Sequence, residues 1–380
     1  MVLLLLLGTA PAPVLAAAPV IDGVAVFPDT SIWNTPVDRL PVAADSSAFV
    51  ATIGADRTLR ADFGAGTWDG GPIGIPFATV SGTQQKVPIE FYYADESDPG
   101  PYPIPSGVPR EWGSDHHVIV LDRDNGLLYE VFDAEEQPDG SWHAGSGAVF
   151  DLRSNTLRPA SWTSADAAGL PILPGLVRFD EVASGEITHA IRFTAPETRR
   201  AYVWPARHFA SSLTGPHYPP MGQRFRLKAD FDLSGYSPQT WVILQALRTY
   251  GMVLADNGSS WFLSGAPDPR WDDEDLRELR QVPGSAFEAV DVSSLVVDPD
   301  SGEARGTGPG PFPGHAAPLD HDGDGLFEDV NGNDRPDFAD VVLLFNHADL
   351  VARSGWEPYY DFNNNSRFDF ADIVVLFGGL

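Results

Sequence analysis

The sequence contains no cysteine, so neither disulfide bonds nor thiolate chemistry is available to this protein. Lysine is almost as scarce: Lys86 and Lys228 are the only two, whereas Asp and Glu together number 53. The formal net charge of −29 repels nucleic acid and anionic membrane surfaces at long range. We therefore expect no nucleic-acid partner, and we expect any small module to be held by a metal ion rather than by disulfides.

Long apolar segments are also missing, because no stretch of about 18 apolar residues occurs, and no membrane span is expected. The run from Val2 to Leu7 is too short to cross a bilayer, and the small residues Ala16 to Ala18 follow it. We expect residues 1–18 to be a cleaved signal peptide, with a buried N-terminal strand as the alternative. A cleaved signal predicts a protein that is secreted or associated with the cell surface.

Glycine (37) and proline (34) are abundant, which favours many turns and short strands over long helices. The clearest strand signal is the run 116–121, which is followed by an Asn-Gly turn at 123–126 and a return strand at 127–132. Further strands are expected at 147–151, 187–194, 201–204, 224–231, 252–255, 260–264 and 287–290.

Two helices are expected between these strands. Ser237 and Pro238 form an N-cap and a first-turn proline, and Gly251 ends that helix. Asp272 opens a second helix over 276–282, with acidic residues at its favourable end. Runs of strands with few helices predict a mainly β body over residues 19–298, folded as a β-sandwich or jelly-roll. No P-loop, G-x-G-x-x-G or G-x-S-x-G element occurs in a suitable context, which argues against nucleotide and serine-hydrolase chemistry.

Residues 299–318 are rich in Gly and Pro and predict a linker to a separate module at 319–380. In that module two segments repeat without a gap, 32 residues apart (329 to 361). Each places Asp or Asn at positions one, three, five, nine and twelve of a twelve-residue loop: Asp329, Asn331, Asn333, Asp337 and Asp340, then Asp361, Asn363, Asn365, Asp369 and Asp372.

This spacing suits calcium, a hard cation that takes six to eight oxygen ligands. Position seven contributes a backbone carbonyl, which Arg335 and Arg367 can provide. Each loop runs into an apolar stretch, 341–345 and 373–377, which reads as a short helix that packs against the other. Because the acids repel one another without the ion, metal binding and folding are expected to be coupled. The alternative is an acidic, solvated tail.

The repeated loops resemble the dockerin type I module, a duplicated half EF-hand, over roughly residues 319 to 380. The resemblance implies that the two sets of loop residues above bind calcium and that a cohesin-like protein is the partner. Position six, usually glycine, is Asp334 in one loop and Ser366 in the other, so Asp334 is expected to adopt a left-handed conformation. Upstream, Asp320, Asp322 and Asp324 look like the head of another calcium loop, which binds a third ion or extends the first site.

The body carries no motif that assigns an activity, so its candidates rest on residue type and position. Asp115 and His116 lie where the chain enters the expected strand 116–121 and suit an oriented base or a metal site, with a structural edge histidine as the alternative. His189 lies in an otherwise apolar strand, either hydrogen-bonded in the core or aimed into a cleft. The candidate catalytic residues are Asp115, His116, Glu130, His189, Arg207 and His208.

Tryptophans near loop residues add a candidate platform for sugar rings: Trp68, Trp112, Trp142, Trp162, Trp261 and Trp271. These features favour a secreted polysaccharide-active enzyme, a glycoside hydrolase or a polysaccharide lyase. The alternative is a non-catalytic glycan-binding, adhesive or structural surface protein. A metal-dependent hydrolase lacks a compact ligand motif and ranks below both. Convergence of His116, Glu130, His189 and His208 in one pocket would favour an enzyme, and scattered positions a binding protein.

Overall fold

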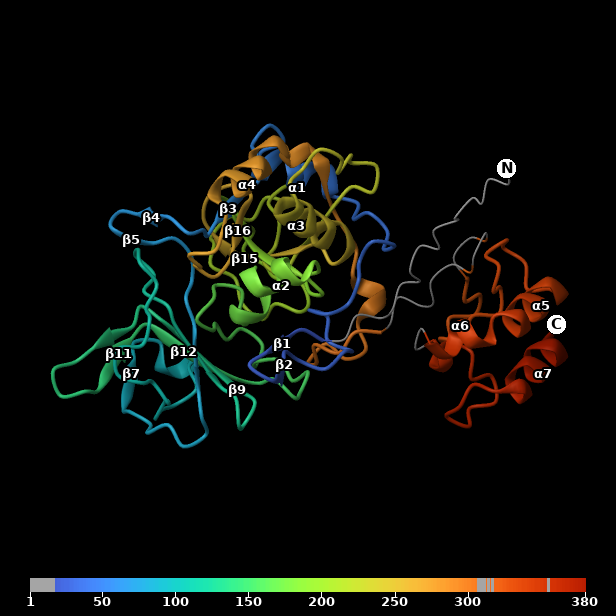
Figure 1. Ribbon diagram of the computed structural model, residues 1–380, viewed down its shortest axis with the longest axis horizontal. Helices are drawn as coiled ribbons and strands as arrows, with labels where there is room; N and C mark the ends of the chain where they lie inside the picture. The colour runs from blue at the N-terminus through green and yellow to red at the C-terminus, as the bar shows by residue number, and fades with distance from the viewer. Residues whose placement is uncertain (1–17, 306–311, 313–314, 316–317, 354–355) are drawn as a thin grey trace, which may run out of the picture. The chain divides into compact units, whose positions relative to one another are not determined.

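The computed structural model describes residues 18–305, 312, 315, 318–353 and 356–380 (Figure 1). It comprises two compact units, the body and the C-terminal tail, which are described separately. Residues 1–17 lie outside the described residues, so the expected signal peptide stays a prediction. The start of the expected linker belongs to the body, because Ser301 and Ala304 form bridges with Thr156 and Val296. Among the described residues, no helix has the length and apolar character needed to cross a membrane.

The body contains two main sheets with the strand orders β12-β9-β8-β6 and β17-β14-β15-β13-β16-β3. The four-stranded sheet consists of β6 (Ala78–Val80), β8 (Val118–Asp122), β9 (Leu127–Phe132) and β12 (Ser146–Asp151). The six-stranded sheet consists of β3 (Arg60–Asp62), β13 (Ile191–Ala195), β14 (Arg224–Leu227), β15 (Met252–Asn257), β16 (Phe262–Ser264) and β17 (Phe287–Ala289). Two strand pairs and a three-stranded sheet complete the body. The pairs are β1 (Val20–Ile21) with β2 (Val24–Ala25) and β4 (Thr67–Trp68) with β5 (Gly71–Pro72), and the small sheet has β10 (Glu135–Glu136) and β7 (Ile89–Phe91) on either side of β11 (Trp142–Ala144).

The sheet-rich body agrees with the mainly β expectation, but the sandwich or jelly-roll arrangement is not confirmed. Both main sheets are mixed, since β6 runs parallel to β8, β13 to β15 and β16 to β3. Jelly-rolls are built from antiparallel strands, whereas parallel neighbours need crossover connections. Figure 1 shows the four-stranded sheet, with β9 and β12, at one end of the body and the six-stranded sheet at the other.

The helices begin and end where their local chemistry requires. Ser237 caps α3 (Pro238–Thr249) by accepting a hydrogen bond from the Thr240 amide, and Gly251 follows with a φ of 68°. Asp272 caps α4 (Asp273–Arg277), which continues as the 3-10 helix η3 (Glu278–Gln281). The remaining body helices are α1 (Ser46–Ile53), α2 (Phe179–Ser184), η1 (Ala94–Glu96), η2 (Leu173–Gly175), η4 (Gly284–Ala286) and η5 (Ser293–Leu295).

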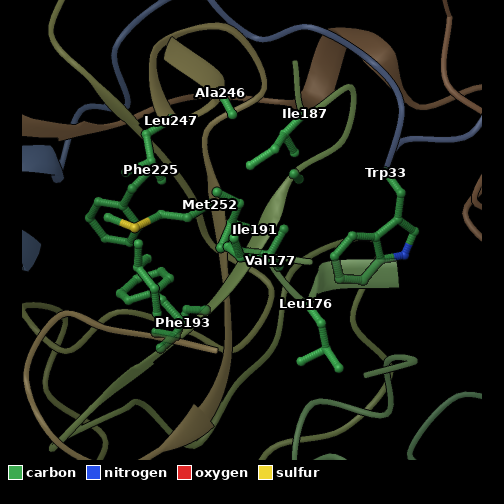
Figure 2. Close-up of a cluster of buried hydrophobic side chains, with 14 of the residues drawn as sticks. Trp33, Leu176, Val177, Ile187, Ile191, Phe193, Phe225, Ala246, Leu247 and Met252 are labelled. Carbon is green, nitrogen blue, oxygen red and sulfur yellow. The ribbon is translucent and has the colours of Figure 1, made fainter. Parts of the chain in front are cut away.

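An aromatic cluster forms the centre of the body's core. Phe193 of β13 is fully buried, and its ring lies 5.5 Å from that of Phe225 and 5.6 Å from that of Trp261. Figure 2 shows Phe193, Phe225 and Met252 gathered together. Because these side chains come from β13, β14 and β15, their packing fixes the centre of the six-stranded sheet.

Glu130 places a carboxylate inside this apolar interior. It lies in the middle of β9, is fully buried, and accepts hydrogen bonds from the amides of Ile172 (2.8 Å) and Leu173 (2.8 Å). Leu173 begins η2, which packs against β13 of the other sheet. Glu130 therefore ties the four-stranded sheet to a segment held on the six-stranded sheet.

The tail is a small helical unit with its own core. It contains α5 (Phe338–Asn346), α6 (Ala348–Arg353), η6 (Glu357–Tyr359) and α7 (Phe370–Gly379), and α5 packs against α7. Its buried side chains include Leu344, Tyr360 and Leu376. The two apolar stretches predicted to pair are therefore helices in mutual contact.

Removing the central ring of the body should be costly. We expect Phe193→Ala to lower the free energy of unfolding by about 3–5 kcal/mol, because it removes a buried ring and leaves a cavity. Tyr92→Ala is the control, since Tyr92 is 82% exposed and its loss should change stability by about 0.5 kcal/mol or less. Denaturant unfolding followed by tryptophan fluorescence measures both, and equal effects would contradict the assignment of the core.

Glu130 should make the stability of the body depend on pH. Burial raises the pKa of Glu130 to about 7, against the hydrogen bonds from Leu173 and Ile172 that favour its ionised form. Because the folded protein holds this proton more tightly than the unfolded chain, Glu130 should reduce stability progressively as pH rises from about 4.5 to about 7.

Glu130→Gln should remove this dependence. We expect its stability relative to wild type to improve by on the order of 3 kcal/mol between pH 4.5 and pH 8. Glu90→Gln, at an exposed glutamate, should follow the wild-type profile. Parallel profiles for wild type and Glu130→Gln would show that Glu130 takes no proton in the folded state.

Candidate functional site

A cleft of about 900 Å³ opens in the body between the β4–β5 hairpin, the segment 110–117 and one face of the six-stranded sheet. Its lining carries acidic, imidazole, guanidinium and indole groups: Asp62, Asp69, Glu111, Asp115, Asp256, His116, His117, Arg110, Arg192, Trp68 and Trp112. A cleft of this size with converging polar groups is the expected form of a binding or active site.

Strand register lines up the polar groups on the floor of the cleft. Asp62 at the end of β3 pairs with Ser264 on β16. Ser264 in turn accepts a hydrogen bond from Arg192 of β13 (2.6 Å from Nη1 to Oγ). Because directly paired residues of neighbouring strands share a face, Asp62, Ser264 and Arg192 form a row across the sheet.

Arg192 is the buried cation of this row. Its guanidinium donates to both carboxylate oxygens of Asp166 (2.8 and 3.0 Å) and to Asp256 Oδ2 (3.1 Å). Arg192 and Asp166 are almost completely buried, whereas Asp256 faces the cleft with its side chain 23% exposed. Burial, together with the charge of Asp166, raises the pKa of Asp256 to about 6 despite the attraction of Arg192.

The segment before β8 brings a second charged pair to the cleft. His117 is 2% exposed, and its Nδ1 forms a short hydrogen bond with Glu111. Its Nε2 donates to the carbonyl of Ala165 (3.0 Å), which fixes the ring. Burial disfavours the charged imidazole, but Glu111 outweighs this and raises the pKa of His117 to about 9. Burial likewise disfavours ionised Glu111, yet the charge and hydrogen bonds of His117 lower its pKa.

The charges of Arg192 and of Glu111, the partner of His117, both act on Asp62. Asp62 is exposed on the floor of the cleft, but partial desolvation by the surrounding protein raises its pKa. The charges of Glu111 and Asp115 raise this pKa further, whereas that of Arg192 lowers it. The carboxylates that line the cleft are Asp62, Asp69, Glu111, Asp115 and Asp256, and the cations there are Arg110, Arg192 and His117. Acidic charge therefore exceeds basic charge in the cleft.

Two exposed tryptophans stand at the cleft, Trp68 at 63% and Trp112 at 51% exposure. Trp112 donates from Nε1 to the carbonyl of Asp69 (2.9 Å) and lies over Gly71 of β5. A Cβ atom at Gly71 would come within 2.1 Å of the Trp112 ring, so only glycine allows this contact. Of the other tryptophans proposed for a sugar platform, Trp142, Trp261 and Trp271 are buried in the core, and Trp162 packs on Arg158.

The six candidate catalytic residues do not come together, since only Asp115 and His116 line the cleft. His116 precedes β8 instead of belonging to it, has a φ of 49°, and lies 3.6 Å from Asp133.

The other four candidates form structural contacts elsewhere in the body. Glu130 is sealed in the core, and His189 is fully buried against Glu181 (3.2 Å) and the Ala190 carbonyl (2.8 Å). Arg207 binds the Arg158 and Pro299 carbonyls, and His208 binds the Ala167 carbonyl (2.8 Å).

Sequence reasoning missed Asp62, Glu111, His117, Arg192 and Asp256. Arg192 offered one signal, an arginine inside an apolar strand, which calls for a buried acidic partner. Asp62 and Glu111 carried no such signal in the sequence. Each lies in a polar stretch, and its place in the cleft depends on residues far away in the chain.

In the tail, the two repeated loops close with the same hydrogen bonds. Asp329 Oδ1 accepts from the Asn333 amide (3.1 Å), and Asp361 Oδ1 accepts from the Asn365 amide (3.0 Å). Both helices that follow begin with a capping box, made by Asp337 with Asp340 and by Asp369 with Asp372. The repeat seen in the sequence is therefore a repeat in structure.

Position six of each loop adopts the left-handed conformation that usually requires glycine. Asp334 has a φ of 65° and Ser366 a φ of 64°. The expectation for Asp334 is confirmed, and the second loop takes the same path despite a serine there.

The predicted ligand positions of each loop carry carboxylate and amide oxygens, the kind of ligand that calcium takes. Asp340 and Asp372 are fully buried carboxylates, and burial raises the pKa of Asp340 with help from Asp329 and Asp337. Asn363 Oδ1 is buried without a hydrogen-bond partner, although it occupies a ligand position. The carboxylates of Asp340 and Asp372 accept backbone amides, so among these atoms the unpaired amide oxygen of Asn363 is the one that a hard cation would satisfy.

Upstream of the first loop, ligand atoms of Asp320, Asp322 and Glu328 lie within 4.8 Å of one another. Glu328 Oε2 is buried without a hydrogen-bond partner, and burial, with Asp322 and Asp324 nearby, raises the pKa of Glu328. A third ion here, or an extension of the first site, stays a prediction.

Comparison of the chain with protein-family models, curated proteins and solved structures finds no match in any of the three. The dockerin resemblance of the tail thus stays a prediction, and the function of the cleft has to be inferred from its own chemistry.

Proposed function

We propose that the body is a secreted glycoside hydrolase acting on a polysaccharide and that the tail is a calcium-binding, dockerin-like docking module. The observation that supports the enzyme is the cleft, where Asp62 and Asp256 share a sheet face and Trp68 and Trp112 stand at the opening. Sugar rings stack on exposed indoles, and glycosidic bonds are hydrolysed between two carboxyl groups.

The environments of the carboxyl groups suit general acid–base chemistry. Asp256, with a pKa of about 6, holds a proton at mildly acidic pH and can give it to the leaving-group oxygen. Asp62 is more open to solvent and takes the role of base or nucleophile. Arg192 is a positioning residue, because its contact with Asp256 Oδ2 fixes that carboxyl group in the cleft.

The charge of the cleft favours hydrolysis over lyase chemistry. A lyase acting on a uronate needs a cation to neutralise the sugar carboxylate. Arg192 is engaged by Asp166 and Asp256, and Arg110 is the other guanidinium of the lining. The excess of carboxylates would repel a polyuronate, so we infer a substrate without acidic sugars.

A non-catalytic glycan-binding or surface structural protein is the second candidate. It is favoured by the scattered positions of His189, His208 and Glu130, which do not line the cleft. The exposed indoles would serve a binding protein equally well. Turnover, as opposed to binding alone, separates the two functions.

The enzyme proposal is tested by release of reducing ends from a panel of neutral, amino-sugar and uronate polysaccharides. We expect activity on a glycan without uronates, falling as pH rises through about 6 because the acid loses its proton. Asp62→Asn and Asp256→Asn should each reduce the rate about a hundredfold or more. Asp139→Asn, at an exposed aspartate outside the cleft, is the matched control.

Binding to the same glycans, measured by calorimetry, completes this test. Binding without turnover, weakened by Trp112→Ala, would support the second candidate and reject the first. Neither binding nor turnover on the panel would reject both.

The calcium proposal rests on the paired loop geometry of the tail. Amide hydrogen exchange of the full chain measures it locally, on α5 and α7, with the body as internal reference. Calcium should protect both helices and a chelator should expose them, because the ion cancels repulsion among buried carboxylates. Asp340→Asn should weaken calcium binding on the order of tenfold or more. Equal exchange with and without calcium would overturn the proposal.

The tail helices α5 and α7 expose an apolar surface that could contact another protein. Large apolar side chains remain 42–65% exposed there: Phe338, Val342, Phe345, Phe370, Val374, Val375 and Phe377. We propose that this surface contacts a cohesin-like protein, which would hold the secreted enzyme at a cell surface or in a larger assembly.

A further inference from the structure

We propose that Glu111, Asp115 and His117 form a binding site for one divalent first-row transition cation, Mn²⁺ or Zn²⁺, on the wall of the cleft. One ligand atom from each of these residues lies within 4.8 Å of the others, which is the spacing of groups that share an ion. This site uses none of the carboxyl groups proposed for hydrolysis, so metal binding alone tests it.

His117 is oriented as metal-binding histidines are. Its Nε2 donates to the Ala165 carbonyl (3.0 Å), and its ring packs on Phe132, with centroids 5.8 Å apart. These contacts leave Nδ1 directed at Glu111, and a metal ion bound at Nδ1 would release to solvent the proton that these two groups now share. A histidine ligand usually donates its second ring N–H to a carbonyl or carboxylate, which fixes the ring and presents the other nitrogen to the metal.

The backbone around the site is held in place. The Glu111 amide donates to the His117 carbonyl (2.9 Å), which closes the segment on itself. The carbonyls of Asp115 and His116 accept from the amides of Asp133 and Ala134, at the end of β9. All three proposed ligands therefore belong to one short segment anchored to the four-stranded sheet, so the site is preformed.

The charges around the segment favour a cation. The negative charges of Glu111 and Asp115 act on Asp62, which lines the same cleft, and Arg192 is already engaged by Asp166 and Asp256. Two carboxylates with one imidazole suit Mn²⁺ or Zn²⁺ better than calcium, which prefers oxygen ligands throughout. Asp115 is half-buried at the cleft surface, which leaves the remaining coordination positions open to water or to a ligand.

The competing explanation is a structural ion pair between His117 and Glu111 in which Asp115 takes no part. The two explanations differ at Asp115, whose carboxylate accepts only from the neighbouring Ser114 hydroxyl among the hydrogen bonds of the described residues. Asp115→Asn should therefore fold normally while removing one ligand. Glu111→Gln is a second, more deeply placed variant.

Titration of the full chain with Mn²⁺, and separately with Zn²⁺, tests the site by calorimetry in excess calcium, which keeps the tail loops occupied. We expect one equivalent of at least one of the two ions to bind in wild type. Binding should weaken at least about tenfold in Asp115→Asn and in Glu111→Gln. His143→Gln is the matched control, since His143 also lies beside a glutamate, Glu90 (3.7 Å), but on the exposed surface.

Nitrogen NMR of histidine-labelled protein gives a readout that a merely structural pair would not move. Zn²⁺ should shift the Nδ1 resonance of His117, assigned by its loss in His117→Gln, and leave that of His143 unchanged. Binding of neither ion to wild type in excess calcium, or wild-type affinity in folded Asp115→Asn, would overturn the proposal.

Discussion

The ion pair between Arg192 and Asp166 is the interaction on which the cleft depends. Both side chains are almost completely buried, so each needs the other to offset the cost of leaving water, and loss of either would cost about 3–5 kcal/mol. The remaining donors of Arg192 reach Ser264 and Asp256. One guanidinium thereby fixes a strand pair and orients a carboxyl group, and the row of polar groups on the sheet follows from it.

The two units of the protein solve the problem of stability in different ways. The body is large enough to bury an aromatic centre around Phe193, and it needs no cross-links. The tail has a smaller apolar core and turns inward the carboxylates of Asp340 and Asp372. In the proposed calcium-bound form, an ion replaces the disulfides that a chain without cysteine cannot make.

Local chemistry made much of the fold predictable. β9 spans Leu127–Phe132 as the Asn-Gly turn and the apolar run predict, and α3 begins after Ser237. The run 201–204 forms only a bridge between Tyr202 and Met221, because that segment finds no continuous partner strand. Parallel pairing and the cleft depend on contacts between residues far apart in the chain, such as Asp62 with Ser264. Periodicity carries no information on such contacts. The sequence could therefore suggest histidines as candidates but could not predict which of them line the cleft.

The indole of Trp112 resting on Gly71 has a mechanical consequence. Trp112 directly follows Glu111, and its ring is fastened to the β4–β5 hairpin through the Asp69 carbonyl. The Trp112 side chain thus links the hairpin to the segment that carries Glu111. The hairpin therefore supports the backbone next to Glu111, which its hydrogen bond to the His117 carbonyl already holds, so the spacing of charges at the opening is fixed from both sides.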